Sequence, residues 1–394
     1  MKTKRAFKYR IYPTQEQQAA LDIQFGHSRF VYNAALVARK AAYKETGKGA
    51  NYNDTAWLLT LWKGGLPWLK EADSQVLQQK LRDLDRAYKN FFEGRAGYPT
   101  FKSKHDKQSI RYPQRFKVEG SRVYLPKVGW VRTVFHRPVE GKMKNCTVSK
   151  TKTGKYFISI QCDVEQPEPN PPGGVVGIDL GLKHFAVLST GEKIEHPQYL
   201  RKTERRLKRA QRVLSRRQKG SKGREKARQK VALLHEKVAN QRSDFLHKLS
   251  HRVATTYGHI KIEDLNVAGM VRNHRLAKSI SDSGWSEFGR QLGYKSEWRG
   301  GFTEKTDRWF ASSKTCSICG LVNQGLKLHH RFWICECGTE HDRDHNAAKN
   351  IECFEATAGI AESYAGGDRV SPVLVLPTQA VVAEAGSPSA SSLG

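Results

Sequence analysis

The chain lacks long hydrophobic runs, and this shortage excludes a class of protein. No segment approaches the ~20 consecutive apolar residues that a membrane-spanning helix needs. The N-terminal segment alternates basic and aromatic residues and lacks the apolar core of a secretory signal. We therefore expect a cytoplasmic protein, in the cytosol or the nucleoid, that has no membrane partner.

Acidic residues are also scarce, with 38 Asp and Glu against 68 Lys and Arg, so the 394-residue chain has a net charge of +30. A length of 394 residues predicts two or three domains, and 38% hydrophobic residues suffice for their cores. The charge predicts a polyanionic partner, with nucleic acid as the first candidate. The excess is densest over residues 201–250, which hold 18 basic and 4 acidic residues. Apolar residues recur there at helical spacing, which indicates an antiparallel helical pair, interrupted at 220–223, whose cationic face binds phosphates.

Cysteine is sparse outside one short stretch, which excludes a secreted disulfide framework. Two Cys-Gly pairs separated by 15 residues are typical of a structural Zn²⁺ site and give the predicted ligands Cys316, Cys319, Cys335 and Cys337. The second pair is Cys-x-Cys where Cys-x-x-Cys is usual, so its turn must be tighter, and His341 competes as a ligand. The remaining three, which we expect to be ordinary buried residues, are Cys146, Cys162 and Cys353.

Three acidic residues stand out by their context. Asp179 ends an apolar strand before a glycine turn, Glu263 ends another apolar strand, and Asp344 lies at the start of a helix. Single acids at such places are usually solvated turns or helix caps. If the fold brings these three together, they can hold two Mg²⁺ ions for phosphodiester hydrolysis. Composition alone does not establish that convergence.

The order of local patterns predicts the organisation of the chain. Residues 4–12 alternate as a strand, and Thr14 with Gln17 forms a capping box that starts a helix, which we expect to break near Gly26. Helical spacing continues to Phe92, and short strands with turns fill 101–164, including a hairpin turn at 152–154. These strands predict a small antiparallel barrel that the N-terminal strand joins, with the helical block inserted. Pro- and Gly-rich residues 167–174 form a linker, and 356–394 are expected to be disordered.

Aromatic residues of the N-terminal half have two possible roles, base stacking or, as the better default, core packing; they include Tyr9, Tyr32, Tyr52, Trp57 and Trp62.

Several short motifs together resemble the TnpB family of transposon-encoded proteins, which are RNA-guided DNA endonucleases and relatives of the type V CRISPR effectors. The motifs follow one another along nearly the whole ordered chain: Lys8–Pro13, Arg29–Asn33, Gly97–Lys102, Gly177–Gly181, Ile262–Asn266, Ser312–Gly320 and Asp342–Ala348. The resemblance implies an α/β multidomain fold with an RNase H-like (RuvC) nuclease domain, a zinc-ribbon insertion, and an N-terminal antiparallel WED-like β-barrel carrying a REC-like helical insertion. The implied ranges are 1–12 and 99–166 for the barrel, 13–98 for the helical insertion, 175–311 and 339–355 for the nuclease domain, and 312–338 for the zinc-binding insertion.

The same resemblance implies the function. Asp179, Glu263 and Asp344 would be the catalytic triad that binds Mg²⁺ or Mn²⁺, and Asp342 is the weaker of the two candidates in the last motif. The implied partners are a guide RNA from the transposon end and a double-stranded DNA target beside a short flanking motif, bound by a monomer. Two alternatives stay open: a nucleic-acid-binding accessory protein that does not cut, and a transposase that catalyses DNA strand transfer.

Overall fold

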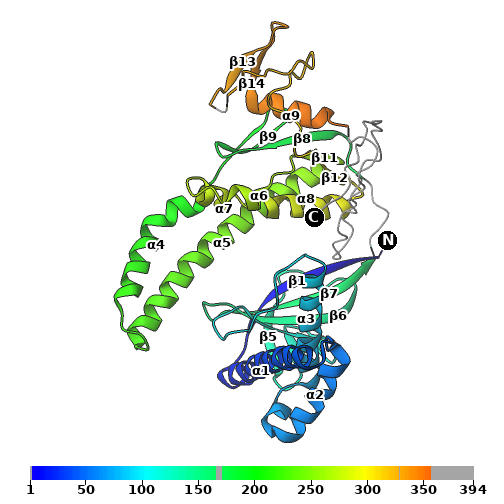
Figure 1. Ribbon diagram of the computed structural model, residues 1–394, viewed down its shortest axis with the longest axis vertical. Coiled ribbons are helices and arrows are strands. Elements are labelled where there is room, and N and C mark those ends of the chain that lie inside the picture. The colour runs from blue at the N-terminus through cyan, green and yellow to red at the C-terminus, as the bar shows by residue number, and fades with distance from the viewer. Residues whose placement is uncertain (1, 166–170, 328, 356–394) are drawn as a thin grey trace, which may run out of the picture.

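A computed structural model describes residues 2–165, 171–327 and 329–355, and Figure 1 shows them in two lobes. We call residues 2–165 the N-terminal lobe and residues 171–355 the C-terminal lobe. The expected tail at 356–394 and the first half of the expected linker, 167–170, lie outside the described residues. No helix within the described ranges has both the length and the apolar character to cross a membrane.

The N-terminal lobe is built on a seven-stranded antiparallel sheet in the order β2-β6-β7-β1-β5-β4-β3. Its strands are β1 (Lys2–Tyr12), β2 (Gln108–Tyr112), β3 (Lys117–Glu119), β4 (Arg122–Leu125), β5 (Gly129–Val134), β6 (Lys142–Lys150) and β7 (Tyr156–Glu165). Alternate residues of β1, namely Phe7, Tyr9 and Ile11, are buried in the core of this sheet. The predictions that the N-terminal strand joins the later strands, and that residues 152–154 turn a hairpin, are confirmed.

Three helices pack beside this sheet: α1 (Gln15–Thr46), α2 (Tyr52–Gly65) and α3 (Ser74–Phe92), with a short 3-10 turn, η1 (Pro67–Glu71). The capping box of Thr14 and Gln17 is present and starts α1 as predicted. The predicted break near Gly26 is wrong, because α1 continues through it. A helical glycine costs about 1 kcal/mol, and burial of flanking residues such as Phe25 and Val31 outweighs that cost.

The C-terminal lobe holds a mixed five-stranded sheet in the order β10-β9-β8-β11-β12. The strands are β8 (Val175–Leu180), β9 (His184–Leu188), β10 (Lys193–Glu195), β11 (His259–Ile262) and β12 (Phe302–Lys305). The pairs β10–β9 and β9–β8 are antiparallel, whereas the pairs β8–β11 and β11–β12 are parallel. The molecule is therefore a mixed α/β protein.

Helices cover both faces of this sheet, as Figure 1 shows for α8 (Trp285–Glu297) on one side and α9 (Arg343–Cys353) on the other. α9 approaches β8 so closely that a Cβ added at Gly177 would lie 2.1 Å from the carbonyl oxygen of Ala348. The basic segment forms α4 (Tyr199–Arg216) and α5 (Lys222–Thr256), which pack together as an antiparallel arm. The predicted helical pair and its interruption are thus confirmed. Two short helices, α6 (Val267–Met270) and α7 (Ala277–Ser283), precede α8.

A small module follows β12 and contains β13 (Phe332–Ile334) paired with β14 (Glu340–Asp342). Its core is small, with Leu326 and Trp333 packed beside two of the predicted cysteine ligands. Of the three cysteines expected to be buried structural residues, Cys146 and Cys162 are buried. The prediction is wrong for Cys353, which is exposed at the last position of α9.

Polar contacts join the two lobes. Glu236 of α5 accepts hydrogen bonds from Lys155 Nζ at 2.8 Å and Thr153 Oγ1 at 2.9 Å, both on the β6–β7 hairpin. The Arg5 guanidinium lies 4.6 Å from the ring centre of Trp298. The arm of α4 and α5 is therefore tied to the N-terminal sheet.

Candidate functional site

The three predicted carboxylates come from the ends of neighbouring elements in the C-terminal lobe. β8 and β11 are parallel partners in which Ile178 pairs with Ile262, so the next residues, Asp179 and Glu263, are side by side in register. α9 packs on β8, and its first turn carries Asp344. The fold thus brings Asp179, Glu263 and Asp344 to one end of the sheet, although 84 and then 81 positions separate them in the sequence.

The electrostatics of Asp179 reflect this crowding. Burial raises its pKa well above the ordinary value, and repulsion from Glu263, Asp344 and Asp342 raises it further, against the opposing charge of Arg343. The pKa of Glu263 is also raised, first by burial and then by Asp264. Two half-buried carboxyl groups side by side therefore resist carrying their full negative charge without a cation.

The three carboxylates supply oxygen donors of the kind that divalent-metal nuclease sites use. Two-metal sites hold ions about 3.5–4 Å apart that share such ligands. Asp179 and Glu263 lie side by side in register, and Asp344 is close enough to both strands to raise the pKa of Asp179.

Asp342 and Asp344 differ in their contacts. Asp342 caps α9 by accepting hydrogen bonds from the backbone N–H groups of Asp344 at 3.1 Å and His345 at 3.2 Å. Its second oxygen binds Lys193 Nζ at 2.6 Å. Burial raises the pKa of Asp342, but the bond from Lys193 and the backbone N–H groups more than offset this, and the net pKa is lowered. Asp342 is therefore engaged in holding the helix end.

Asp344 has a looser environment, with the Arg331 guanidinium 3.6 Å from its carboxylate. The neighbouring His345 hydrogen-bonds through Nε2 to the carbonyl oxygen of Ser189, at 3.0 Å. Sequence reasoning missed Lys193 and Ser189, which hold the first turn of α9 from the β9–β10 side. No local pattern identifies them, since Lys193 lies 149 residues from its partner.

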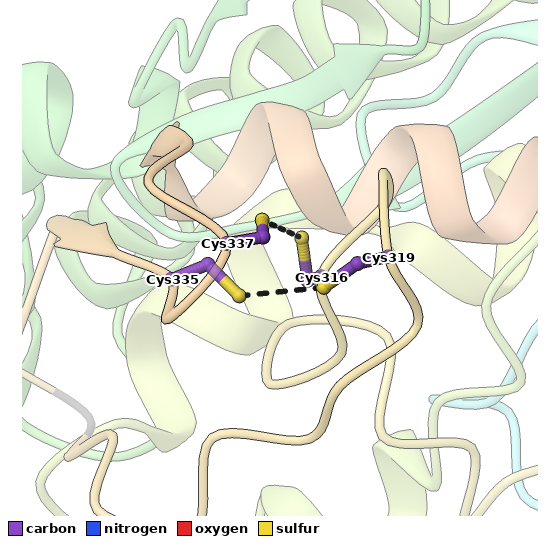
Figure 2. A group of neighbouring side chains, drawn as sticks. All are labelled: Cys316, Cys319, Cys335 and Cys337. Atoms are coloured by element: carbon purple, nitrogen blue, oxygen red, sulfur yellow. Dashed lines mark hydrogen bonds between the residues drawn. The ribbon is translucent and has the colours of Figure 1, made fainter.

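The four predicted zinc ligands converge, as Figure 2 shows. Cys316 Sγ lies 3.8 Å from Cys337 Sγ, and Cys319 Sγ lies 3.5 Å from Cys335 Sγ. Four sulfurs at a Zn–S distance of about 2.3 Å in a tetrahedron would be about 3.8 Å apart. The cluster therefore has the donor set and the spacing to bind zinc.

Local contacts shape this cluster. The Cys-x-Cys pair closes through Gly338 at φ +84°, whose N–H bonds to the carbonyl oxygen of Cys335 at 2.9 Å. A hydrogen bond from the hydroxyl of Thr339 lowers the pKa of Cys337 to about 6, which favours the thiolate that binds metal. His341 Nε2 lies 3.0 Å from Cys316 Sγ, so it is a hydrogen-bond partner of one ligand and stands outside the group of four.

The cysteine module is anchored on the helix that carries Asp344. Asn346 of α9 accepts a hydrogen bond from the N–H of Ser317 at 2.9 Å and donates one to the carbonyl oxygen of Thr315 at 2.7 Å. Asn350, one turn later, donates to the carbonyl oxygen of Ser312 at 2.7 Å. The two candidate metal sites therefore share a structural element.

The aromatic side chains proposed for base stacking divide by exposure. Tyr9 and Tyr32 are buried in the two cores of the N-terminal lobe, as core packing predicted, whereas Trp57 of α2 is 64% exposed. Tyr52 and Trp62 are partly buried against the same core as Tyr32, so Trp57 offers the most exposed ring of the five to an unpaired base.

Comparison with known proteins identifies the family of this chain. It is 42% identical to a Streptomyces pristinaespiralis protein named "Putative RNA-guided DNA endonuclease", over 94% of this chain and 92% of that relative. It is 38% identical to "Putative RNA-guided DNA endonuclease InsQ" of Escherichia coli K12, over 89% and 92%. It is 26% identical to "TnpB-like protein L770" of Acanthamoeba polyphaga mimivirus, over 87% and 72%. The chain belongs to the TnpB family.

Three family models match parts of this TnpB chain. One described as "Probable transposase" matches residues 159–274, and one described as "Cas12f1-like, TNB domain" matches 285–351. The first two candidate acids lie in the former range, and Asp344 with all four cysteines lies in the latter. A third model, described as "Helix-turn-helix domain", matches residues 1–48, where the structure has strand β1 and the single uninterrupted helix α1.

Proposed function

We propose that this protein is an RNA-guided DNA endonuclease of a transposable element that cleaves target DNA beside a short flanking motif. The observation that carries the proposal is the gathering of Asp179, Glu263 and Asp344, from three distant parts of the chain, at one end of the sheet. The names of the two relatives that match along nearly their whole length support it.

The nuclease site would hold divalent cations, Mg²⁺ or Mn²⁺. Oxygen donors alone suit such hard ions, and a cation would relieve the repulsion that raises the pKa of Asp179. When bound, these ions supply a lowered pKa for an attacking water and stabilisation of the leaving oxygen. Asp342 and Lys193 would fix the first turn of α9, and with it the direction in which Asp344 faces its two partners.

The other parts would divide the remaining tasks. Residues 1–12 and 99–166, with the helical insertion at 13–98, would be a WED-like and REC-like lobe that binds guide RNA and target DNA as a monomer. Residues 175–311 and 339–355 would be the RuvC-like nuclease domain, and the cysteines of the insertion at 312–338 would hold a structural Zn²⁺. The net charge of +30 supports nucleic-acid partners of both kinds.

The test begins with the RNA. The protein is expressed with its native flanking DNA, purified at high salt, and the RNA that remains bound is sequenced. The recovered complex is then mixed with a matching DNA duplex and Mg²⁺. A discrete RNA from the end of the element that directs cutting is the expected result.

Substitution at the triad separates cutting from binding. Asp179→Ala should abolish cleavage and leave binding of RNA and DNA intact, whereas Asp244→Asn, which removes an exposed acid on α5, should cut normally. Heterogeneous RNA that directs no cutting would favour a non-cleaving accessory protein. Products in which donor and target ends are joined would favour strand transfer over hydrolysis.

A further inference from the structure

A strongly exposed tryptophan lies in the loop that follows β12. Trp309 is 87% exposed, more than any other large hydrophobic residue in the described part of the chain. Within the same described ranges, no aromatic ring and no cation packs against its indole. Single exposed hydrophobic residues are common on protein surfaces, so this exposure gains meaning only from the position and the order of its loop.

The position of the loop is the carboxylate end of the five-stranded sheet. β12 is the parallel partner of β11, and the N–H of Thr306 continues their pairing by bonding to the carbonyl oxygen of Ile262 at 3.0 Å, directly before Glu263. Arg308, the residue before the tryptophan, pairs with Asp264 at 2.6 Å, and Asp264 directly follows Glu263. The loop is therefore tied to the residues on either side of one of the three site carboxylates.

The order of the loop comes from contacts around the exposed ring. The backbone N–H of Trp309 donates to the Asp307 carboxylate at 2.7 Å, and that of Phe310 donates to the carbonyl oxygen of Asp307 at 3.2 Å. The ring of Phe310 packs against Phe354 at the end of α9, with the ring centres 5.0 Å apart. The exposed indole therefore stands on a fixed backbone, and a ring that is already fixed loses little conformational entropy when it binds.

We propose that Trp309 stacks on a nucleobase of the DNA strand in the carboxylate site and thereby positions the phosphodiester that is cut. Stacking tolerates any sequence, because every base has a flat π-face, and this tolerance suits a nuclease whose target is chosen by base pairing with a guide. The inference rests on the proposed function for the identity of the strand. Residues 356–394, which begin two positions after Phe354, are the alternative occupant that the test must exclude.

Hydroxyl-radical labelling of the full-length protein, analysed by mass spectrometry, measures whether the indole is covered. Trp309 is labelled in the free protein, in the complex with guide RNA, and after addition of a matching DNA duplex to the Asp179→Ala complex, which should bind DNA without cutting it. We expect oxidation in the first two states and its loss only after DNA is added. Protection in the free protein would assign the ring to residues 356–394, and protection by guide RNA alone would assign it to RNA; either result overturns the proposal.

Cleavage measures whether the stack positions the phosphodiester. Loss of one base stack, worth about 1–3 kcal/mol, predicts that Trp309→Ala lowers the single-turnover rate roughly 5- to 150-fold. Trp309→Phe keeps an aromatic face and should retain most of the rate. Because the ring is exposed, neither variant should change the thermal midpoint, so misfolding cannot produce the difference.

A target strand with one abasic nucleotide, moved along the strand, identifies the base. One abasic position beside the cut should slow the unmodified protein as Trp309→Ala does, and the two changes together should cost no more than one. Trp57→Ala, which removes an exposed indole of the other lobe, is the matched control. The same abasic position should slow this control as much as it slows the unmodified protein.

Equal rates for Trp309→Ala and the unmodified protein, or additive effects of Trp309→Ala and every abasic position, would overturn the proposal. Cutting by the unmodified complex without protection of Trp309 by DNA would refute the stack and leave the endonuclease intact. Protection of Trp309 by DNA without any cutting would refute the endonuclease and support the contact with a base.

Discussion

The two aspartates at the start of α9 should respond differently to the same change. Asp342→Asn keeps a side-chain oxygen that can cap the helix, whereas Asp344→Asn removes a carboxylate from the triad. We expect Asp344→Asn to remove detectable cleavage. Asp342→Asn should lower cleavage by no more than about 10- to 100-fold, the range for residues that orient a ligand without being one.

The free energy of unfolding tests the helix-capping role of Asp342 independently of cleavage. Loss of an N-cap costs about 1 kcal/mol, within a range of about 0.5–2. The Lys193 pair adds about 0.2–1 kcal/mol, because the lysine side chain is 40% exposed and the pair is screened. Asp342→Ala should therefore destabilise the nuclease lobe by about 1–3 kcal/mol, and Asp342→Asn by less than about 1 kcal/mol.

Three assays check these values: urea unfolding and thermal unfolding of the zinc-loaded protein without added Mg²⁺, and cleavage of a guide-matched duplex by each variant. A midpoint shift of about 2–4 °C per kcal/mol is expected in thermal unfolding of a unit of this size. The reasoning is refuted if Asp342→Asn loses cleavage as completely as Asp344→Asn, since Asp342 would then be a ligand. It is also refuted if Asp342→Ala is as stable as the unmodified protein.

Three further predictions concern packing, metal and pH. Gly177→Ala places a Cβ 2.1 Å from a backbone oxygen of α9, so it should cost at least about 1–3 kcal/mol and impair cleavage, whereas Gly293→Ala, which meets nothing within 4 Å, should do neither in the same unfolding and cleavage assays. Chelation of zinc, or Cys316→Ser, should unfold residues 312–342 and leave the five-stranded sheet protected in hydrogen exchange, because the cysteine module has almost no other core. Burial, then the charge of Arg299, lowers the pKa of Lys295 to about 8. The unfolded chain then binds the extra proton between pH 8 and about 10.4, so stability should rise with pH across that window, by at most about 1.4 kcal/mol per pH unit. Urea midpoints should show this rise relative to Lys295→Met, and parallel curves for the two proteins would contradict it.

The sequence by itself determined the features that depend on neighbouring residues. Alternation in β1, the capping box at Thr14, the helical spacing of the basic arm and the paired cysteines each involve contacts within a few positions, so a local pattern carries them. The prediction failed at Gly26 and Cys353, because the packing of distant elements decides whether a helix continues and how much of its last turn is covered.

Tertiary structure alone decided how the candidate site is assembled. The register of β8 on β11 sets Glu263 beside Asp179, and the lack of a side chain at Gly177 lets α9 bring Asp344 to them. The bond from Lys193 to Asp342 joins residues 149 positions apart. Such contacts leave no periodic trace in the sequence, because their geometry exists only after the strands and helices have docked.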